Sequence, residues 1–273
     1  MDYPIFINDA WLPAEKAFVP MKDLGFVRGY GIFDFFRMMD GRAIFLSDHL
    51  DRFLSSASKM GIQHSYTKEY LSSLILELAS SAQDPCLGVK MILTGGESLN
   101  GFDPSGSANL YITPAVFSFA DPERGMHLKS FNFQREMADI KSLNYAYAIR
   151  HRSEVKAQGC DDVLFYTDAY GVSEASRSNL FYVKNKVIHT PADFILEGIT
   201  RKQVLHVAKQ HYEIRVGKCS LADFLSADEV FTTGSTKRVL PIFSIDQKPI
   251  HQGSRGPVTA HLYDLLISRE KDN

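Results

Sequence analysis

The sequence contains few cysteines, and their arrangement indicates neither a metal site nor a disulfide framework. The 3 cysteines are Cys86, Cys160 and Cys219, which lie far apart, and none belongs to a C-x-x-C pair. Small disulfide-stapled domains carry a dense and even set of cysteines instead. An odd, sparse count is typical of a reducing compartment, so we expect a cytoplasmic protein without a bound metal.

Long hydrophobic runs and an excess of charge of one sign are also absent. No stretch approaches the roughly 18 apolar residues of a membrane-spanning helix. The first residues, MDYPIFINDAW, lack the basic start and apolar core of a secretory signal. The formal net charge is −2, and the 30 Lys and Arg residues are spread along the chain. We therefore expect neither a membrane nor a nucleic-acid partner.

The glycine-rich motifs of nucleotide-binding folds are missing as well. G-x-G-x-x-G does not occur between an expected strand and an expected helix, and G-x-x-x-x-G-K-[ST] does not occur at all. We also find no internal repeat. The chain has 273 residues, of which 45% are hydrophobic and 23% charged. These values are usual for a globular protein of one large or two modest domains.

Strand and helix patterns are interspersed along the chain, which predicts a mixed α+β fold. Asp40-Gly41 is a hairpin-turn signal between two apolar runs, and Gly61 is a helix stop after a run with one apolar face. The polar segment 118–124 is typical of a linker. We expect an N-terminal α+β domain at 1–117 and a C-terminal domain at 125–273. The C-terminal domain should include helices over 144–158, 199–211 and 257–270.

Lys141 lies in ADIKSLNYAYAIR, directly after an apolar residue and before Ser-Leu-Asn. It is either a solvated charge or a reactive amine. A lysine becomes a nucleophile when burial or a neighbouring cation lowers its pKa. Its most demanding use is a Schiff base with pyridoxal phosphate. That cofactor requires donors for its phosphate and a carboxylate for its ring nitrogen.

Two segments could meet the phosphate requirement. EGITRKQVL places Gly198, Ile199 and Thr200 at the first turn of an expected helix, where free N–H groups and the helix dipole favour an anion. TTGSTKR offers a second small-residue turn with Ser235 and Thr236. Taken alone, each segment is equally consistent with an ordinary turn.

Glu174 is the candidate carboxylate for the ring nitrogen. It lies in GVSEASRSNLF, between a turn and a strand. An exposed loop glutamate is the alternative. The residues around it, Ser173, Ala175 and Ser176, are small enough to admit a flat ring.

The ordered set IKSLN, VSEASRSN, EGITR and TTGSTKRVLPI resembles the class IV aminotransferase family, the fold-type IV pyridoxal-phosphate enzymes. The family includes branched-chain aminotransferases, D-amino-acid aminotransferases and aminodeoxychorismate lyases. GYGIFDFFRMMDGRAIFLSDHLDRF and GCDDVLFYTDAYGVSEASRSNLFYV are similar to further family segments, so the resemblance covers nearly the whole chain.

The resemblance implies pyridoxal 5'-phosphate as the cofactor and a role for each matching residue. Lys141 would form the Schiff base and carry a proton between Cα and C4′, and Glu174 would bind the pyridinium nitrogen. Thr236 would lie near the substrate carboxylate. The remaining cofactor contacts would be Arg52, Ile199, Thr200 and Ser235 at the phosphate, Asn179 beside Glu174, and Tyr145 near the phenolic oxygen.

The resemblance also implies an architecture. The small N-terminal domain would be joined to a larger C-terminal pseudo-barrel α/β domain, with the cofactor in the cleft between them. Family members are homodimers in which loops of one subunit close the other's site. The partners implied are therefore a small amino substrate and a second copy of the chain.

The sequence leaves the reaction open between transamination and the lyase reaction. The Arg-x-His pair of D-amino-acid aminotransferases is absent from the loop TGGESLNGFDP, and RVLP replaces the Glu-Val-Thr-Pro of branched-chain enzymes. Arg28, Arg37 and, as a weaker candidate, Lys237 could bind a dianionic substrate, although each could instead be a surface charge.

We expect an aminotransferase for an amino acid and a 2-oxo acid, because this is the wider class. The alternative is an aminodeoxychorismate lyase, which forms 4-aminobenzoate and pyruvate for folate synthesis. A third reading is an inactive family member. The joint presence of Lys141, Glu174 and Arg52 argues against it.

Overall fold

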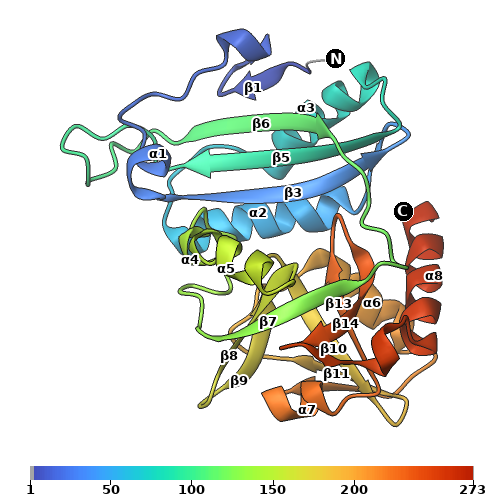
Figure 1. Ribbon diagram of the computed structural model, residues 1–273. Helices are drawn as coiled ribbons and strands as arrows, with labels where there is room; N and C mark the ends of the chain where they lie inside the picture. The colour runs from blue at the N-terminus through green and yellow to red at the C-terminus, as the bar shows by residue number, and fades with distance from the viewer. Residues whose placement is uncertain (1–2, 273) are drawn as a thin grey trace. The chain divides into compact units, whose positions relative to one another are not determined.

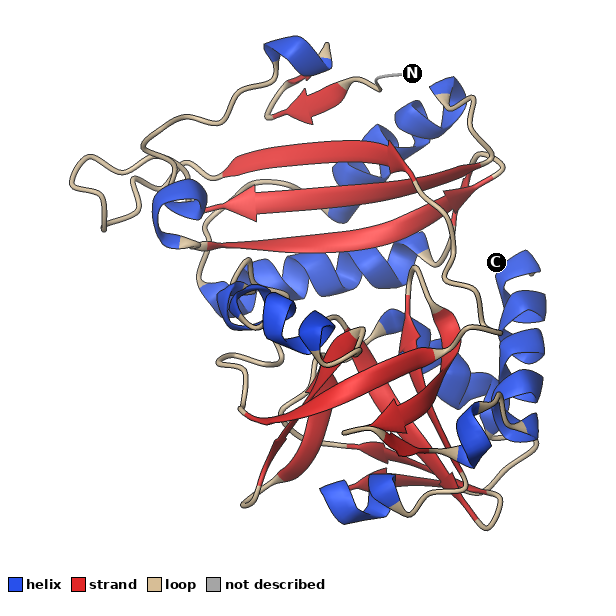
Figure 2. Cartoon of the chain, viewed as in Figure 1, coloured by secondary structure: helices blue, strands red, loops and turns tan. Residues whose placement is uncertain are grey.

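The computed structural model describes residues 3–272 and divides into two compact units. Unit 1 consists of Met1–Ser118 and Ile140–Asn144, and unit 2 consists of Phe119–Asp139 and Tyr145–Asn273. Each unit has its own sheet (Figures 1 and 2). The expected domain limits of 117 and 125 remain predictions. The sequence did not indicate that residues 140–144 belong to unit 1 while both flanking segments belong to unit 2.

The sheet of unit 1 has six strands in the order β2-β1-β6-β5-β3-β4. All of its strand pairs are antiparallel. The Asp40–Gly41 turn is confirmed, since both residues have positive φ and join β3 to β4. The strands are β1 (Ile5–Ile7), β2 (Ala10–Leu12), β3 (Gly31–Met39), β4 (Arg42–Ala43), β5 (Cys86–Thr94) and β6 (Asn109–Val116).

Two long helices, α2 (Leu46–Met60) and α3 (Lys68–Ser81), form the core of unit 1 with its sheet. The predicted stop of α2 is confirmed, because Gly61 adopts the left-handed conformation at its C-cap. The helix begins after Phe45, which is its N-cap and has the left-handed conformation. The shorter η1 (Ala14–Lys16) and α1 (Leu24–Arg28) complete the unit.

The sheet of unit 2 closes into a barrel, which confirms the expected pseudo-barrel. Its strand order is β12-β11-β10-β13-β14-β7-β8-β9, and β9 pairs in turn with β10. The ring therefore runs through six strands (Figure 2). The strands are β7 (Met126–Asn132), β8 (Asp162–Thr167), β9 (Gly171–Ala175), β10 (Ser178–Lys184), β11 (Val187–Pro191), β12 (Ile214–Gly217), β13 (Glu229–Gly234), β14 (Arg238–Ile245) and β15 (Lys248–Pro249).

Side chains alternate between the two faces of β10, as the period of a strand requires. Leu180 and Tyr182 belong to one core cluster, whereas Phe181 and Val183 pack with α6 and α8 in another. The helix expected over 144–158 is instead two short helices, because the chain breaks at His151. The helices are α4 (Ala146–Arg150), α5 (Arg152–Ala157), α6 (Ile199–Ala208), α7 (Leu221–Leu225), η2 (His251–Gly253) and α8 (Pro257–Lys271).

Candidate active site

The segment around Lys141 lies along the edge of β3 in unit 1. The Phe33 N–H donates to the Lys141 carbonyl at 2.9 Å, and the Leu143 N–H donates to the Gly31 carbonyl at 3.0 Å. Ser142 forms an isolated bridge with Ile32 between these two bonds. The short β4 pairs only with the far end of β3, so the near end of this edge is available to residues 141–143. The backbone of Lys141 is thereby held by a strand more than one hundred residues earlier.

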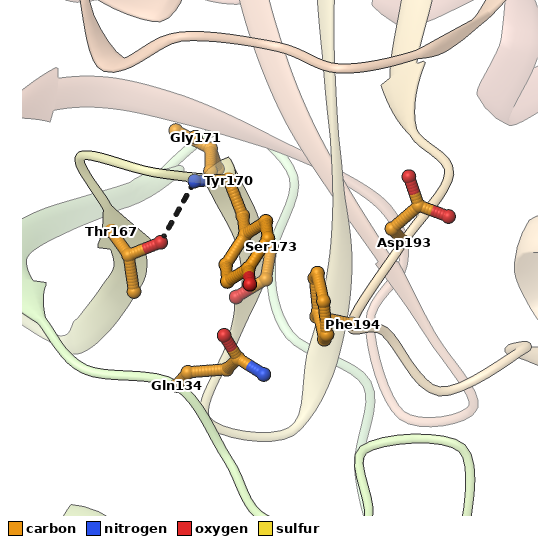
Figure 3. A pocket seen from close by; sticks show the side chains of 8 residues that line it. Gln134, Thr167, Tyr170, Gly171, Ser173, Asp193 and Phe194 are labelled. Carbon is orange, nitrogen blue, oxygen red and sulfur yellow. Dashed lines mark hydrogen bonds between the residues drawn. The ribbon is translucent and has the colours of Figure 1, made fainter.

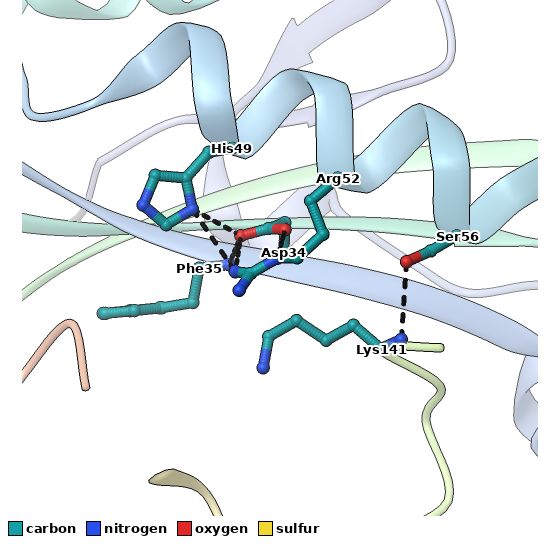
Figure 4. Close-up of polar contacts among 6 residues, drawn as sticks. All are labelled: Asp34, Phe35, His49, Arg52, Ser56 and Lys141. Atoms are coloured by element: carbon teal, nitrogen blue, oxygen red, sulfur yellow. Dashed lines mark hydrogen bonds and ion pairs between the residues drawn. The ribbon is translucent and has the colours of Figure 1, made fainter. Parts of the chain in front are cut away.

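The side chain of Lys141 lies against an aromatic face. Its Nζ is 4.5 Å from the centroid of the Phe33 ring, within the range of a cation–π contact. Its backbone N–H faces Ser56 Oγ on α2 at 3.4 Å (Figure 4). The lysine is half-buried, which excludes a freely solvated surface charge. The backbone and the side-chain amine of Lys141 are thus both positioned by residues of unit 1.

Arg52 lies on α2 and forms a side-on ion pair with Asp34 of β3. Its Nε is 2.8 Å from Asp34 Oδ2, and its Nη2 is 2.8 Å from Oδ1. His49 Nδ1 lies 2.7 Å from the same Oδ1 (Figure 4). Burial raises the pKa of Asp34, but the nearby charges of Arg52 and His49 outweigh it and hold this pKa well below its usual range. Asp34 is therefore a buried anion.

Sequence reasoning found Arg52 but missed Asp34 and His49. Two signals were present. Asp34 interrupts the apolar run GIFDFFRMM, and a charge within a buried strand requires a partner. His49 and Arg52 are three residues apart on α2 and so share a helix face. Neither signal names the partner, because the strand and the helix meet only in the folded unit.

Glu174 is buried on β9, which excludes the exposed-loop alternative. Its Oε1 accepts from Arg135 Nε at 2.9 Å, and its Oε2 accepts from the Leu196 N–H at 3.0 Å. Arg135 also donates to the carbonyl of Ala138. The carboxylate is therefore ionised and fixed in orientation. Sequence reasoning missed Arg135, which lies 39 residues away.

Asn179 pairs with Glu174 across β9 and β10. Its Nδ2 donates to the Leu196 carbonyl at 2.7 Å, so both side chains contact the backbone of the same residue. A Cβ on Gly198 would lie 2.1 Å from Asn179 Oδ1. Position 198 therefore requires glycine at the start of α6.

The N-terminus of α6 suits an anion such as a phosphate. Gly198 is the N-cap and makes no side-chain cap, while Ile199 and Thr200 are buried in the first turn. The first N–H groups of a helix have no partner within the helix, and its dipole favours negative charge there. This uncapped start, next to the fixed Glu174 and Asn179, fits the phosphate and ring nitrogen of the cofactor expected from the sequence.

Ser235 and Thr236 lie in the turn between β13 and β14, which begins beside Asn179, the register partner of Thr233. The Thr236 carbonyl accepts from the Ala120 N–H at 3.3 Å. In the same turn Lys237 is engaged within unit 2. Its Nζ lies 3.1 Å from Ser178 Oγ and 3.5 Å from Asp162 Oδ2. Burial lowers the pKa of Lys237 against the opposing effect of Asp162.

The other candidates occupy different environments. Arg28 is exposed at the end of α1, and its Nε donates to the Gly101 carbonyl at 3.0 Å. Arg37 is buried on β3, which excludes a surface charge there. Tyr145 is the N-cap of α4. Unit 1 thus contains Arg28, Arg37, Arg52 and Lys141, and unit 2 contains Tyr145, Glu174, Asn179, Ile199, Thr200, Ser235 and Thr236.

A small pocket opens beside β9 in unit 2. Tyr170 and Phe194 face each other there with ring centroids 4.4 Å apart, and the Tyr170 N–H donates to Thr167 Oγ1 at 3.0 Å (Figure 3). Ser173, the strand neighbour of Glu174, also lines it. The pocket is therefore formed by the start of β9 and the segments beside it.

No helix within residues 3–272 has the length and apolar character needed to span a membrane. Across the same residues, no cluster of three His, Cys, Asp or Glu side chains could hold a metal ion.

A six-stranded α+β unit carrying an anchored lysine, and a barrel unit carrying an anchored carboxylate, define the class of protein. The family model described as Amino-transferase class IV matches residues 31–245 of the chain. The protein belongs to the class IV aminotransferase family, which confirms the resemblance seen in the sequence.

Two similar relatives are both named as aminotransferases, but for different amino acids. A putative branched-chain-amino-acid aminotransferase of Methanocaldococcus jannaschii is 30% identical over 272 residues, covering 94% of this chain and 93% of that one. A D-alanine aminotransferase of Bacillus licheniformis is 28% identical over 272 residues, covering 96% of this chain and 95% of that one. These relatives support membership of the family, but their names do not identify the substrate of this chain.

Solved structures share the fold and support the cofactor. The T.th. branched-chain amino acid aminotransferase complexed with N-(5'-phosphopyridoxyl)-L-glutamate has a TM-score of 0.91 at 25% identity, covering 100% of this chain and 95% of that one. A putative 4-amino-4-deoxychorismate lyase of Legionella pneumophila has a TM-score of 0.86 at 25% identity, covering 94% and 97%. The predicted α+β fold and the prediction of a pyridoxal-phosphate enzyme of this family are confirmed.

Proposed function

We propose that the protein is a pyridoxal-phosphate-dependent aminotransferase that acts on an amino acid and a 2-oxo acid, with Lys141 as the residue that carries the cofactor. The observation that carries the proposal is the anchoring of Lys141 along β3. Its carbonyl is bound by the Phe33 N–H, and its Nζ lies 4.5 Å from the Phe33 ring. A reactive amine must be held in one position, whereas a solvated surface lysine does not require such contacts.

We further propose the remaining contacts of the cofactor and the substrate. Glu174 would bind the ring nitrogen, supported by its burial and its two fixed oxygens. The phosphate would be bound by Arg52, by Ser235, and by Ile199 and Thr200 at the uncapped start of α6. Asn179 would hold the Glu174 segment, and Tyr145 would lie near the phenolic oxygen. Arg28, Arg37 and Thr236 are the proposed substrate contacts.

The division of labour follows from these groups. When bound, pyridoxal phosphate supplies an electron sink for negative charge at the substrate Cα. Lys141 Nζ would take the proton from Cα and return it at C4′ of the cofactor. Glu174 would keep the ring nitrogen protonated as an ionised acceptor. The start of α6 and Arg52 would hold the phosphate, so that the reacting atoms stay aligned with the lysine.

We also propose that the chain forms a homodimer through an apolar face of unit 1. Residues 18–27 and the loop 95–103 are joined by the bonds Leu24 N–H to Gly96 O at 2.8 Å and Ser98 N–H to Lys22 O at 3.1 Å. Together they expose large apolar side chains, an arrangement associated with protein interfaces. These are Phe18, Met21, Phe26, Leu99 and Phe102. Light scattering on the purified protein would measure the mass directly; a monomer would contradict this part of the proposal.

The lysine assignment is tested by spectroscopy and mass spectrometry. Purified protein with pyridoxal phosphate should show a yellow absorption band that borohydride removes, leaving a phosphopyridoxyl mass on the peptide that contains Lys141. Lys141→Ala should lack both. A wild-type protein that takes up no cofactor would overturn the enzyme proposal and favour the inactive family member. A reducible adduct that persists in Lys141→Ala would overturn the lysine assignment alone.

The reaction is tested with two assays on the same preparation. A panel of amino acids with 2-oxoglutarate or pyruvate should give keto-acid products only when the acceptor is present. The lyase remains the second candidate, favoured by the Legionella structure and by the absence of both carboxylate signatures. Release of 4-aminobenzoate from aminodeoxychorismate without an acceptor would show that the protein is a lyase and would overturn the aminotransferase proposal. A cytoplasmic location stays a prediction.

A further inference from the structure

Asp34 occupies an unusual position for a carboxylate. It lies on β3, its residue is 0% exposed, and the strand around it is apolar. A charge in such a place is unfavourable unless it is paired and hydrogen-bonded. The neighbours of Asp34 satisfy both conditions, so its buried carboxylate is paired and hydrogen-bonded.

Four nitrogen atoms surround the two oxygens of Asp34. Oδ1 lies 2.7 Å from the Phe35 N–H, 2.7 Å from His49 Nδ1 and 2.8 Å from Arg52 Nη2. Oδ2 accepts from Arg52 Nε at 2.8 Å. The two contacts with Arg52 are parallel, which is the geometry that fixes the plane of a guanidinium as well as its distance. Asp34 therefore determines which way Arg52 faces.

We propose that Asp34, together with His49, is a positioning residue that sets the plane of Arg52 for recognition of a phosphate. This inference rests on the proposed function, in which Arg52 binds the cofactor phosphate. A guanidinium has five N–H donors, and the side-on pair with Asp34 engages its Nε–Nη2 edge. Because Asp34 on β3 holds this edge, the guanidinium would present its remaining N–H groups to the phosphate in one orientation.

β3 links this pair to the lysine. The Phe33 N–H, one residue before Asp34, binds the Lys141 carbonyl at 2.9 Å. The same short stretch of strand therefore positions both the amine and the arginine within unit 1 (Figure 4). A change at Asp34 should disturb the arginine while leaving the backbone bond to Lys141 in place.

The test uses the whole protein and two forms of the cofactor, pyridoxal phosphate and pyridoxal, which lacks the phosphate. The dissociation constant of each is measured by absorbance titration. In Asp34→Asn an amide nitrogen replaces one oxygen, and in either orientation it faces an N–H donor of Arg52. We expect the preference for pyridoxal phosphate over pyridoxal to fall about tenfold or more, with pyridoxal binding nearly unchanged.

The matched control is Asp51→Asn, which removes the same charge one residue from Arg52. Asp51 is exposed and pairs with Lys68 instead, so the preference should stay at the wild-type value. If Asp34→Asn does not fold, Asp34→Glu keeps the charge, shifts the carboxylate by one methylene and is titrated in the same way. An Arg52→Lys variant should lose the preference, and Asp34→Asn should then have no further effect on it.

The outcomes separate this inference from the proposed function. A loss of preference in the Asp34 variant with unchanged pyridoxal binding supports it. An equal weakening of both ligands, or an unchanged preference, overturns it and leaves Asp34 as a structural ion pair. A wild-type protein that binds neither ligand at Lys141 overturns the proposed function itself, and with it the role of Asp34.

Discussion

Arg135 Nε lies 2.9 Å from Glu174 Oε1, and both side chains are largely buried within unit 2. The other carboxylate oxygen accepts the Leu196 N–H. The pair therefore joins the segment before Lys141 in sequence, the strand β9 and the residues that lead into α6. Its consequence is that the ionised state and the direction of Glu174 depend on an arginine outside the motif that contains Glu174.

Replacing Arg135 by Ala should destabilise the protein strongly. It leaves the buried Glu174 charge without its cation, and removing one partner of a buried pair typically costs about 3–5 kcal/mol. Urea unfolding followed by circular dichroism measures this difference. Arg215→Ala is the control, because Arg215 and Glu213 form an exposed pair, for which a loss of no more than about 1 kcal/mol is expected. Equal losses in both variants would contradict the buried pair.

Replacing Gly198 by Ala should disturb the start of α6. The new Cβ would lie 2.1 Å from Asn179 Oδ1, so either the side chain or the helix must move. Overpacking of this kind costs about 1–3 kcal/mol of stability, and the shifted N–H groups should also weaken binding of pyridoxal phosphate. Thermal unfolding without cofactor and absorbance titration with it measure the two effects. Gly217→Ala is the control, since nothing lies within 4 Å of its added Cβ; an unchanged Gly198→Ala protein would refute the close approach.

Stability should fall as the pH is lowered from about 7 to 5, in part because of His49. Burial and the charges of Arg52 and Arg37 lower the pKa of His49 despite the opposing effect of Asp34. Below the unfolded pKa of about 6.5, the unfolded chain binds a proton that the folded chain does not. The free energy of unfolding should therefore decrease by up to about 1.4 kcal/mol per pH unit for this group.

The contribution of His49 is isolated by comparing variants across that pH range. His49→Gln should flatten the slope of unfolding free energy against pH. His206→Gln should leave it unchanged, because His206 is exposed on α6. Burial also lowers the pKa values of His64 and His189, so part of the slope should remain in His49→Gln. A slope unaltered by His49→Gln would rule out its neutral buried form.

Asp34 contributes with a different pH window. Its pKa is held below the unfolded value of about 3.9, so its stabilisation is complete above that pH and is lost only as the pH falls towards the folded pKa. Asp34→Asn should therefore remove stability at neutral pH and reduce the acid sensitivity below about pH 4. Acid-unfolding curves of the two proteins should converge at low pH; parallel curves would mean that Asp34 is not ionised in the folded chain.

Lys237 should act with Asp162 as a structural pair rather than as a substrate contact. Its Nζ lies 3.5 Å from Asp162 Oδ2, and both side chains are largely buried. Lys237→Met leaves that carboxylate without its cation, which should cost about 3–5 kcal/mol, whereas Lys237→Met combined with Asp162→Asn should cost less than the sum of the single changes. Urea unfolding of the four proteins measures the coupling. Simple additivity would instead favour a role for the lysine outside this pair.

Local chemistry in the sequence predicted much of the fold. The left-handed turn residues Asp40 and Gly41 and the helix stop at Gly61 appear where the sequence indicated them. These features depend on one or a few neighbouring residues. The single helix expected over 144–158 was wrong, because the chain is divided at His151 into two short helices.

The partners of the buried charges were not predictable in this way. Asp34 and Arg52 are 18 residues apart, and Arg135 and Glu174 are 39 apart. Each pair joins different secondary-structure elements, so no periodic pattern records it. The same holds for the placement of residues 140–144 in unit 1, since the edge of β3 that binds them is formed by a distant part of the chain.

The sequence by itself determined the family, the order of the site motifs and the residues whose type suits a bound pyridoxal phosphate. Motifs of this kind follow from side-chain chemistry and backbone conformation, which are local properties. Only the tertiary structure decided that Lys141 lies along β3, that Asp34 sets the plane of Arg52 and that Arg135 holds Glu174. A buried charge takes the partner that folding brings to it, because no water is left to take that place.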